Sequence, residues 1–331
     1  MWMSHPAPVT SPPAPTTPGI ALWKQRHLLH DRQQRIVALH EAVGRPGEMS
    51  IQQVIGLMAV ALEFQPDLIL ELGRLYGNST CAFTEAANIL GIDRCRVTSL
   101  CLTPNWQVVT VPRLRGLVDG RWLSGVEALQ HNILTFDYDR LFASHRKIMV
   151  FWDAHGYDIA NCVLGRILPL LINRPHMVAI HDLSDSRYLD ESQAKYGGKS
   201  LWRHNDWSGR NVRLGWLQSN VEQVVAIVDF ASRNTVPLGS ATDSMRTEMS
   251  PQQLMELENM LGYGLTKLEA GWSWFSLTGI HRSWTFPGFE EPGLGRKLRT
   301  KALIAGLSLA SKWHIEHPMR SIVRASRSIP R

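Results

Sequence analysis

The segment 66–79, PDLILELGRLYGNS, constrains the fold of this chain more than any other stretch. The apolar run at residues 68–70 leads into Glu71 and two glycines, and helix-forming residues follow Ser79. This order predicts a buried strand, a glycine-bearing turn and a helix start. Glycines let a backbone approach a ligand closely, and the free N–H groups of a helix start can bind a polar or anionic group. The spacing E-x-G-x-x-x-G-x-S is neither the dinucleotide fingerprint nor the phosphate loop.

Strands and helices alternate after this segment, which predicts an α/β fold with a parallel sheet covered on both faces. The expected strands span residues 68–72, 96–102, 126–130, 147–152, 176–180, 224–230 and 271–278. The expected helices span residues 20–44, 51–63, 79–90, 159–171 and 251–261, and residues 231–250 are expected to form a loop.

The 331 residues suggest one large or two modest domains. Residues 1–19 hold six of the eighteen prolines, so we expect a tail without fixed structure. A helix at 20–48, a main domain at 49–290 and an extension at 291–331 follow. The polar, Gly-containing stretch 183–213 is expected to form a lid over the strand ends, where long ordered loops are often functional.

The net charge of +6 is concentrated at the end of the chain. Residues 296–331 contain nine Lys/Arg and one acid, which gives +8 there and leaves −2 for the remainder. The nearly neutral body disfavours nucleic-acid binding by the main domain. For the basic segment we expect a helical extension, with an anionic membrane surface or an acidic partner as candidate ligands and docking on the protein body as the alternative.

The rest of the composition indicates a cytoplasmic protein, with peripheral membrane association through the basic segment as a variant. No apolar run approaches the length of about 18 residues that a membrane span needs, and no secretory signal is evident. The four cysteines form no C-x-x-C pair, so we expect reduced, buried thiols rather than disulfides or a zinc site.

Polar side chains follow three of the expected strands. Glu71 ends the first, Asp153 follows the fourth, and His181 and Asp182 follow the fifth. Ligands in such sheets bind beyond the carboxyl ends of the strands, so these groups predict one site.

At the glycine turn the chain resembles the first motif of class I S-adenosylmethionine (SAM) methyltransferases. The likeness is greatest to small-molecule O-methyltransferases and their cephalosporin-hydroxylase-like relatives, and it covers about residues 55–185. The resemblance implies a Rossmann-like seven-stranded methyltransferase sheet and O-methylation of a hydroxyl on a small-molecule or sugar-containing acceptor. The SAM-binding residues that it implies are Glu71, Gly73, Gly77, Asn78, Ser79, Asn132 and Asp153. A Val at Gly73 is expected to block SAM while sparing the fold.

The resemblance also implies a divalent metal. Relatives bind an ion through an acid after strand four and a pair of groups after strand five, which here are Asp153, His181 and Asp182. Mg²⁺, Mn²⁺ and Fe²⁺ are the candidates, and a His ligand favours the transition metals. A metal lowers the pKa of an acceptor hydroxyl and a nearby His can take its proton, so His155 is the first candidate base and His181 the second. The alternatives are that Asp153 caps a helix and His181 is a hydrogen-bonded strand end.

Two positions depart from the family pattern. No acid follows the second strand to bind the SAM ribose, because the chain has Ser99-Leu100-Cys101-Leu102-Thr103 there. Asn132 stands where the adenine side often has Asp. Two alternatives to a methyltransferase therefore stay open: a cephalosporin-hydroxylase-like enzyme on the same scaffold, and a catalytically silent domain used for binding.

Overall fold

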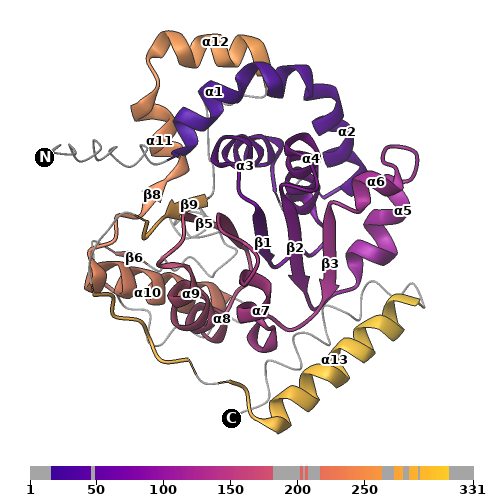
Figure 1. The fold of residues 1–331 in the computed structure, drawn as a ribbon, viewed down its shortest axis with the longest axis vertical. Helices are drawn as coiled ribbons and strands as arrows, with labels where there is room; N and C mark the ends of the chain where they lie inside the picture. Colours follow the sequence, from indigo (N-terminus) through magenta and orange to yellow (C-terminus); the bar gives the residue numbers. More distant parts are fainter. Residues whose placement is uncertain are drawn as a thin grey trace, which may run out of the picture.

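The computed structural model describes residues 16–45, 49–181, 202–203, 206–207, 217–262, 272–278, 283–289 and 291–312. Its centre is a seven-stranded sheet in the order β3-β2-β1-β4-β5-β9-β8 (Figure 1). The strands are β1 (Leu68–Leu72), β2 (Arg96–Cys101), β3 (Val126–Gln130), β4 (Ile148–Trp152), β5 (His176–His181), β8 (Gly239–Ser240) and β9 (Trp272–Phe275). Strands β1 to β5 are parallel, and β9 runs antiparallel between β5 and β8. The expected seven-stranded Rossmann-like sheet is confirmed.

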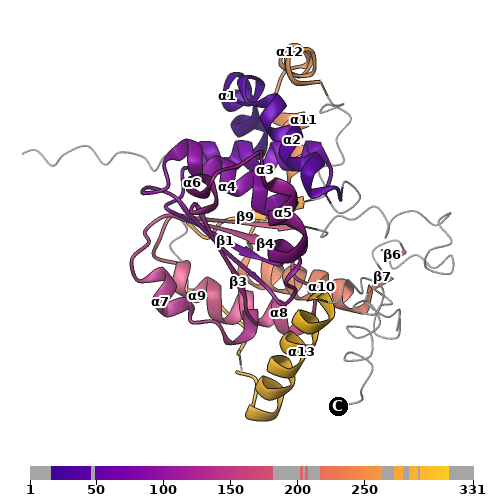
Figure 2. The same cartoon turned by 90° about the vertical axis from the view of Figure 1, so that its right-hand side faces the viewer.

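Helices cover both faces of the sheet, which is seen nearly edge-on in Figure 2. One face packs against α1 (Pro18–Asp31), α3 (Ile51–Phe64), α4 (Asn78–Leu90), α11 (Ala241–Glu248) and α12 (Pro251–Leu261). The other packs against α7 (Tyr138–Phe142), α8 (Tyr157–Cys162), the π-helical turn η3 (Val163–Ile167), α9 (Leu168–Leu171) and α10 (Leu217–Asn234). The side chains of β4 alternate between the two cores, with Met149 and Phe151 on one side and Val150 and Trp152 on the other.

Further elements flank the β3 edge. Helices α2 (Gln33–Val43), α5 (Val111–Leu114) and α6 (Gly120–Leu123) and the π-helical turn η1 (Trp106–Thr110) share a small third core. The 3₁₀ turn η2 (Ile133–Thr135) follows β3, and α13 (Leu294–Lys312) lies beyond the ends of β2 and β3 (Figure 1). The short strands β6 (Trp202–Arg203) and β7 (Asp206–Trp207) pair with each other. They are the described part of the expected lid, whose other residues lie outside the described ranges.

The single helix expected at 20–48 is wrong, because it is divided in two. The backbone leaves the helical region at Arg32, with φ −99° and ψ 1°. Helix α1 then packs on α11 and α12, whereas α2 packs on α4 and α5. No Gly or Pro marks the break, so the divergent packing of the two halves decides it.

The strand expected at 224–230 and the loop expected at 231–250 are also wrong. Ile227, Phe230 and Ala231 are buried, whereas Val228 is largely exposed. That spacing of three and four residues is the period of a helix, and it lets α10 pack against the sheet despite its β-branched residues. The second segment holds β8 and α11, which begins with Ser240 accepting the N–H of Asp243.

Candidate functional site

Strand register brings the expected site residues to one edge of the sheet. Leu72 of β1 lies opposite Trp152 of β4, and Trp152 lies opposite Ile180 of β5. The next residues, Gly73, Asp153 and His181, are therefore neighbours. The Asp153 N–H donates to the Leu72 carbonyl at 2.8 Å, and the Gly73 N–H donates to the Leu100 carbonyl at 2.9 Å. These bonds tie the turns after β1 and β4 to the sheet.

Glu71 is completely buried beneath the glycine turn. Its Oε1 accepts from Ser79 at 2.5 Å, and its Oε2 accepts from Thr80 at 2.6 Å and from Ser99. Burial raises the pKa of the Glu71 carboxyl, and the three hydroxyl donors and Arg74 only partly oppose that effect. Both oxygens accept hydrogen bonds from these hydroxyls, so Glu71 fixes the turn and the start of α4.

Arg74, in the turn after β1, is buried and its guanidinium lies between β2 and β3. Its Nη1 donates to the Ser99 carbonyl at 2.7 Å and to the Ser99 hydroxyl at 2.8 Å, and its Nη2 donates to the Leu129 carbonyl at 3.3 Å. Burial lowers the pKa of the Arg74 guanidinium, while Cys101 and Glu71 raise it. The structure thus places a buried cation beside Ser99, near the end of β2, and the sequence pattern did not predict where the Arg74 side chain points.

The two glycines of the turn are required by the protein itself. Gly73 has φ +98°, and a Cβ there would lie 2.5 Å from the Asp153 carbonyl oxygen. Gly77 has φ +96°, and its Cβ would lie 2.5 Å from the Trp106 ring. Both backbones are left-handed, a conformation that favours glycine. The expectation that a Val at Gly73 spares the fold is therefore wrong, because the side chain would displace the turn after β4.

His181 is held from both sides of its ring. Nδ1 lies 3.0 Å from Asp153 Oδ1, and Nε2 lies 3.2 Å from Gln53 Nε2. The Gln53 carbonyl oxygen accepts the Ser50 N–H at 2.8 Å in the capping box of α3, so its amide NH₂ group faces the imidazole. His181 Nε2 is then an acceptor and Nδ1–H donates to Asp153. Gln53 is a site residue that the sequence analysis missed; the S-x-x-Q pattern at 50–53 indicated only a helix start.

The metal prediction is not tested, because Asp182 lies outside the described residues. The structure does place Asp153 beside His181. A metal bound through either imidazole nitrogen has to displace Asp153 or Gln53. Within the described ranges, no group of three or more His, Cys, Asp or Glu is arranged to bind an ion.

Two further polar groups flank the glycine turn. The Arg45 guanidinium lies over the Tyr76 ring at 4.3 Å, and Asn78 Nδ2 donates to the Arg45 carbonyl at 2.9 Å. Arg45 Nε and Asn78 Oδ1 are buried with no hydrogen-bond partner among the described residues. Buried groups of this kind are costly unless something binds them. They lie beside the start of α4, and the sequence analysis did not single out Arg45.

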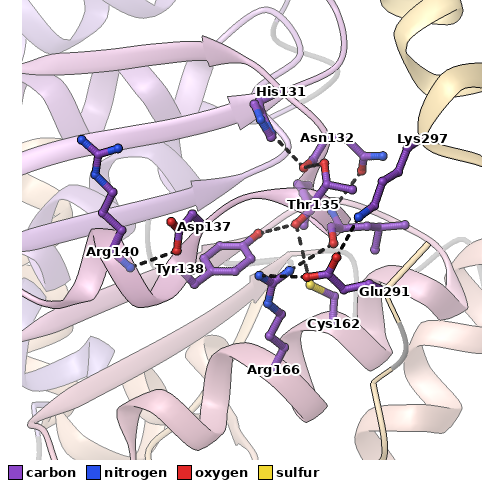
Figure 3. Close-up of polar contacts among 12 residues, drawn as sticks. His131, Asn132, Thr135, Asp137, Tyr138, Arg140, Cys162, Arg166, Glu291 and Lys297 are labelled. Carbon is purple, nitrogen blue, oxygen red and sulfur yellow. Dashed lines mark hydrogen bonds and ion pairs between the residues drawn. The ribbon is translucent and has the colours of Figure 1, made fainter. Parts of the chain in front are cut away.

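Asn132, expected on the adenine side, caps η2 and contacts the C-terminal helix. Its Oδ1 accepts the Leu134 N–H at 3.0 Å, and its Nδ2 donates to Thr300 of α13 at 3.2 Å. Figure 3 shows a second link nearby, in which Arg166 and Lys297 both pair with Glu291 at 3.6 and 2.8 Å. Helix α13 is therefore attached at the end of β3 that the resemblance assigns to adenine.

His155 lies in the turn between β4 and α8 and is half-buried, three residues beyond the end of β4. It shares the carboxyl edge with Asp153, as the base assignment requires.

A hollow of about 570 Å³ lies elsewhere, among Arg35, Glu85, Asn88 and Trp122. It adjoins the last turns of α4, which runs back from the glycine turn, so it is at the opposite edge of the sheet.

Comparisons with known proteins found structural neighbours only. No family model and no curated protein matches the chain. One solved structure like it is the O-methyltransferase TomG from Streptomyces achromogenes, involved in tomaymycin synthesis and in complex with SAM. It has 18% identity over 61% of this chain and 80% of that chain, with a TM-score of 0.41. Another is the SAH-bound methyltransferase PaMTH1 from Podospora anserina, with 15% identity over 76% and 88% and a TM-score of 0.44.

Proposed function

We propose that the chain is a SAM-dependent methyltransferase that binds SAM around the glycine turn and methylates a hydroxyl of a small-molecule acceptor. The observation that carries the proposal is the pair of opposite charges on the two sides of the turn, Asp153 beside Gly73 and Arg45 over Tyr76. The amino-acid end of SAM carries an ammonium and a carboxylate, so it matches this pair.

The residues around the turn fit that ligand. Asp153, partly exposed and oriented by His181, accepts from the ammonium. The Arg45 guanidinium has a buried N–H at Nε that can donate to the carboxylate of SAM. The positive end of α4 also favours this carboxylate. Glu71 and the glycines hold the turn in place. Bound SAM supplies an electrophilic methyl group, and the protein's task is to align the acceptor oxygen and remove its proton. His155 is the proposed base.

Calorimetric titration with SAM tests the cofactor site. We expect stoichiometric binding and a loss of roughly tenfold or more in affinity for Arg45→Met and for Asp153→Asn, because a charge-assisted hydrogen bond contributes about 1.5–3 kcal/mol. The control is Arg26→Met, which removes an arginine packed over Trp23 on α1, far from the sheet edge. No SAM binding by the folded chain, or unchanged affinity in both site variants, would refute the proposal.

Metal assistance is a separate element of the proposal, with Asp153, His181 and Asp182 as the named ligands. Turnover is measured as the SAH formed from SAM in the presence of a panel of phenols, catechols and sugars as acceptors, with and without chelator. Activity that chelation abolishes and Mg²⁺ or Mn²⁺ restores would support a metal. Activity that survives chelation but is lost in His155→Ala would assign the deprotonation to His155 alone.

A further inference from the structure

Helix α13 presents an apolar stripe to solvent. Leu294, Leu298 and Leu309 are 75, 57 and 59% exposed, and Ala305 is exposed as well. At 3.6 residues per turn these four positions fall within about 60° of one another around the helix axis. The stripe therefore runs along most of the helix. Helix α13 itself lies at the edge of the molecule in both views (Figures 1 and 2).

The opposite side of α13 holds the helix on the protein. Leu307 is buried, Thr300 accepts from Asn132, and Ser308 donates to Gln130 at 3.2 Å. The ion pair between Lys297 and Glu291 fixes the first turn. The expected docking of the extension on the body thus accounts for one face of α13 and leaves the leucine stripe uncovered.

Charge distinguishes the candidate occupants of the stripe. Residues 294–312 contain five Lys/Arg and no Asp or Glu. Exposed Arg299 and Lys301 lie on either side of the stripe, where long side chains can extend to the headgroups of a lipid surface. A second α13 would bring like charges together, and residues 1–295 have a net charge of only −2. From this geometry we infer that the stripe binds an anionic lipid surface.

The expected arrangement is a helix lying in the plane of the interface, because no helix of the described ranges is long and apolar enough to cross a bilayer. The leucines enter the acyl boundary and the flanking cations contact anionic headgroups. Glu291 and Asn132 keep the body attached on the other side. This inference does not depend on SAM binding.

Flotation of the full-length chain with phosphatidylcholine vesicles, with and without phosphatidylglycerol, tests the inference. The decisive variant is Leu294→Ser/Leu298→Ser/Leu309→Ser, which keeps every charge of the basic segment and should weaken binding to the anionic vesicles about a hundredfold. Lys301→Ala should weaken it about fivefold and make the residual binding less sensitive to salt. Met255→Ser, on α12 with 61% exposure, is the matched control and should change nothing.

Two outcomes would overturn the inference. Failure to bind the anionic vesicles is one, and equal binding by the triple variant is the other, because it would assign the affinity to charge alone. A concentration-dependent dimer that the triple variant abolishes, without vesicle binding, would assign the stripe to a second copy of the chain. Circular dichroism and the melting temperature of each variant check that the fold is unchanged.

Discussion

The imidazole of His181 lies between Asp153 and Gln53, with Nδ1 at 3.0 Å from the carboxylate and Nε2 at 3.2 Å from the amide nitrogen. A carboxylate at the end of β4 is thereby connected to the first turn of α3. The arrangement requires a neutral ring with its proton on Nδ1. A proton on Nε2 would face the Gln53 NH₂ group, which the capping box holds in place.

Gln53→Glu should favour a proton on His181 Nε2, which is the opposite of the arrangement in the unmodified chain. The new carboxylate can still accept the Ser50 N–H, and its second oxygen can accept a proton from His181 Nε2. The imidazolium should then persist to higher pH than in the unmodified chain, because a charge-assisted bond replaces a neutral one. Long-range ¹H–¹⁵N NMR of the histidines measures both the tautomer and its titration.

The chain contains a matched control for that experiment. Ser250 and Gln253 form the same capping box at the start of α12. Gln253→Glu makes the same chemical change in a second helix, and it should leave the His181 signals unaltered. A wild-type spectrum with the His181 proton on Nε2 would contradict the assignment.

Gly73→Ala should destabilise the fold by about 3 kcal/mol or more. The left-handed backbone costs a non-glycine residue about 1–2 kcal/mol, and the Cβ would also collide with the Asp153 carbonyl. Gly91→Ala is the control, because Gly91 has φ +97° but nothing lies within 4 Å of its Cβ. Urea unfolding of both variants measures the loss in the free energy of unfolding. The difference between them separates the cost of the left-handed backbone from the cost of the collision with Asp153. Equal losses would show that the contact has little effect.

Reagent access to the cysteines tests the interior of the fold. All four thiols are free and buried, as expected from the sequence. Burial raises the pKa of Cys95 and of Cys162 to about 12, so about one thiol in ten thousand is ionised at pH 8. Both should resist Ellman's reagent in the native state and react fully in denaturant. Peptide mapping identifies the labelled sites, and rapid native labelling of either would contradict the packing.

The sequence was sufficient to predict the five parallel strands of the sheet. Strands β1 to β5 are short apolar runs bounded by turn signals, and buried strands show that pattern directly. The prediction from sequence failed at 224–230, where β-branched residues belong to α10. It also failed at Arg32, where no local residue signals the break between α1 and α2. In both places long-range packing overrides local propensity.

The candidate site divides in the same way. Glu71, Asp153 and His181 could be placed because each ends a strand or follows one, and parallel strands end at a common edge. Gln53, Arg45 and Arg74 could not, because their roles depend on where a side chain points. Arg45 is 26 positions before Glu71, and no short-range pattern predicts that its guanidinium lies over Tyr76.

Glu71→Gln should change how stability depends on pH. Since burial raises the Glu71 pKa above 4.5, the folded state retains a proton that the unfolded chain loses as pH rises. The contribution of Glu71 to the free energy of unfolding is therefore largest at acid pH, and it falls as pH increases from about 4.5 through the raised pKa. Glutamine does not titrate, so it removes this decline. It also places an NH₂ group among three hydroxyls, at a cost of about 1–3 kcal/mol.

The Glu71→Gln variant should be less stable than the parent near pH 5, and this deficit in the free energy of unfolding should shrink toward pH 8. Urea unfolding at both pH values measures it, with the exposed Glu127→Gln, expected within about 0.5 kcal/mol of the parent, as the control. A deficit that grows with pH would mean that the hydroxyl donors and Arg74 outweigh burial, and that Glu71 is a stabilising carboxylate.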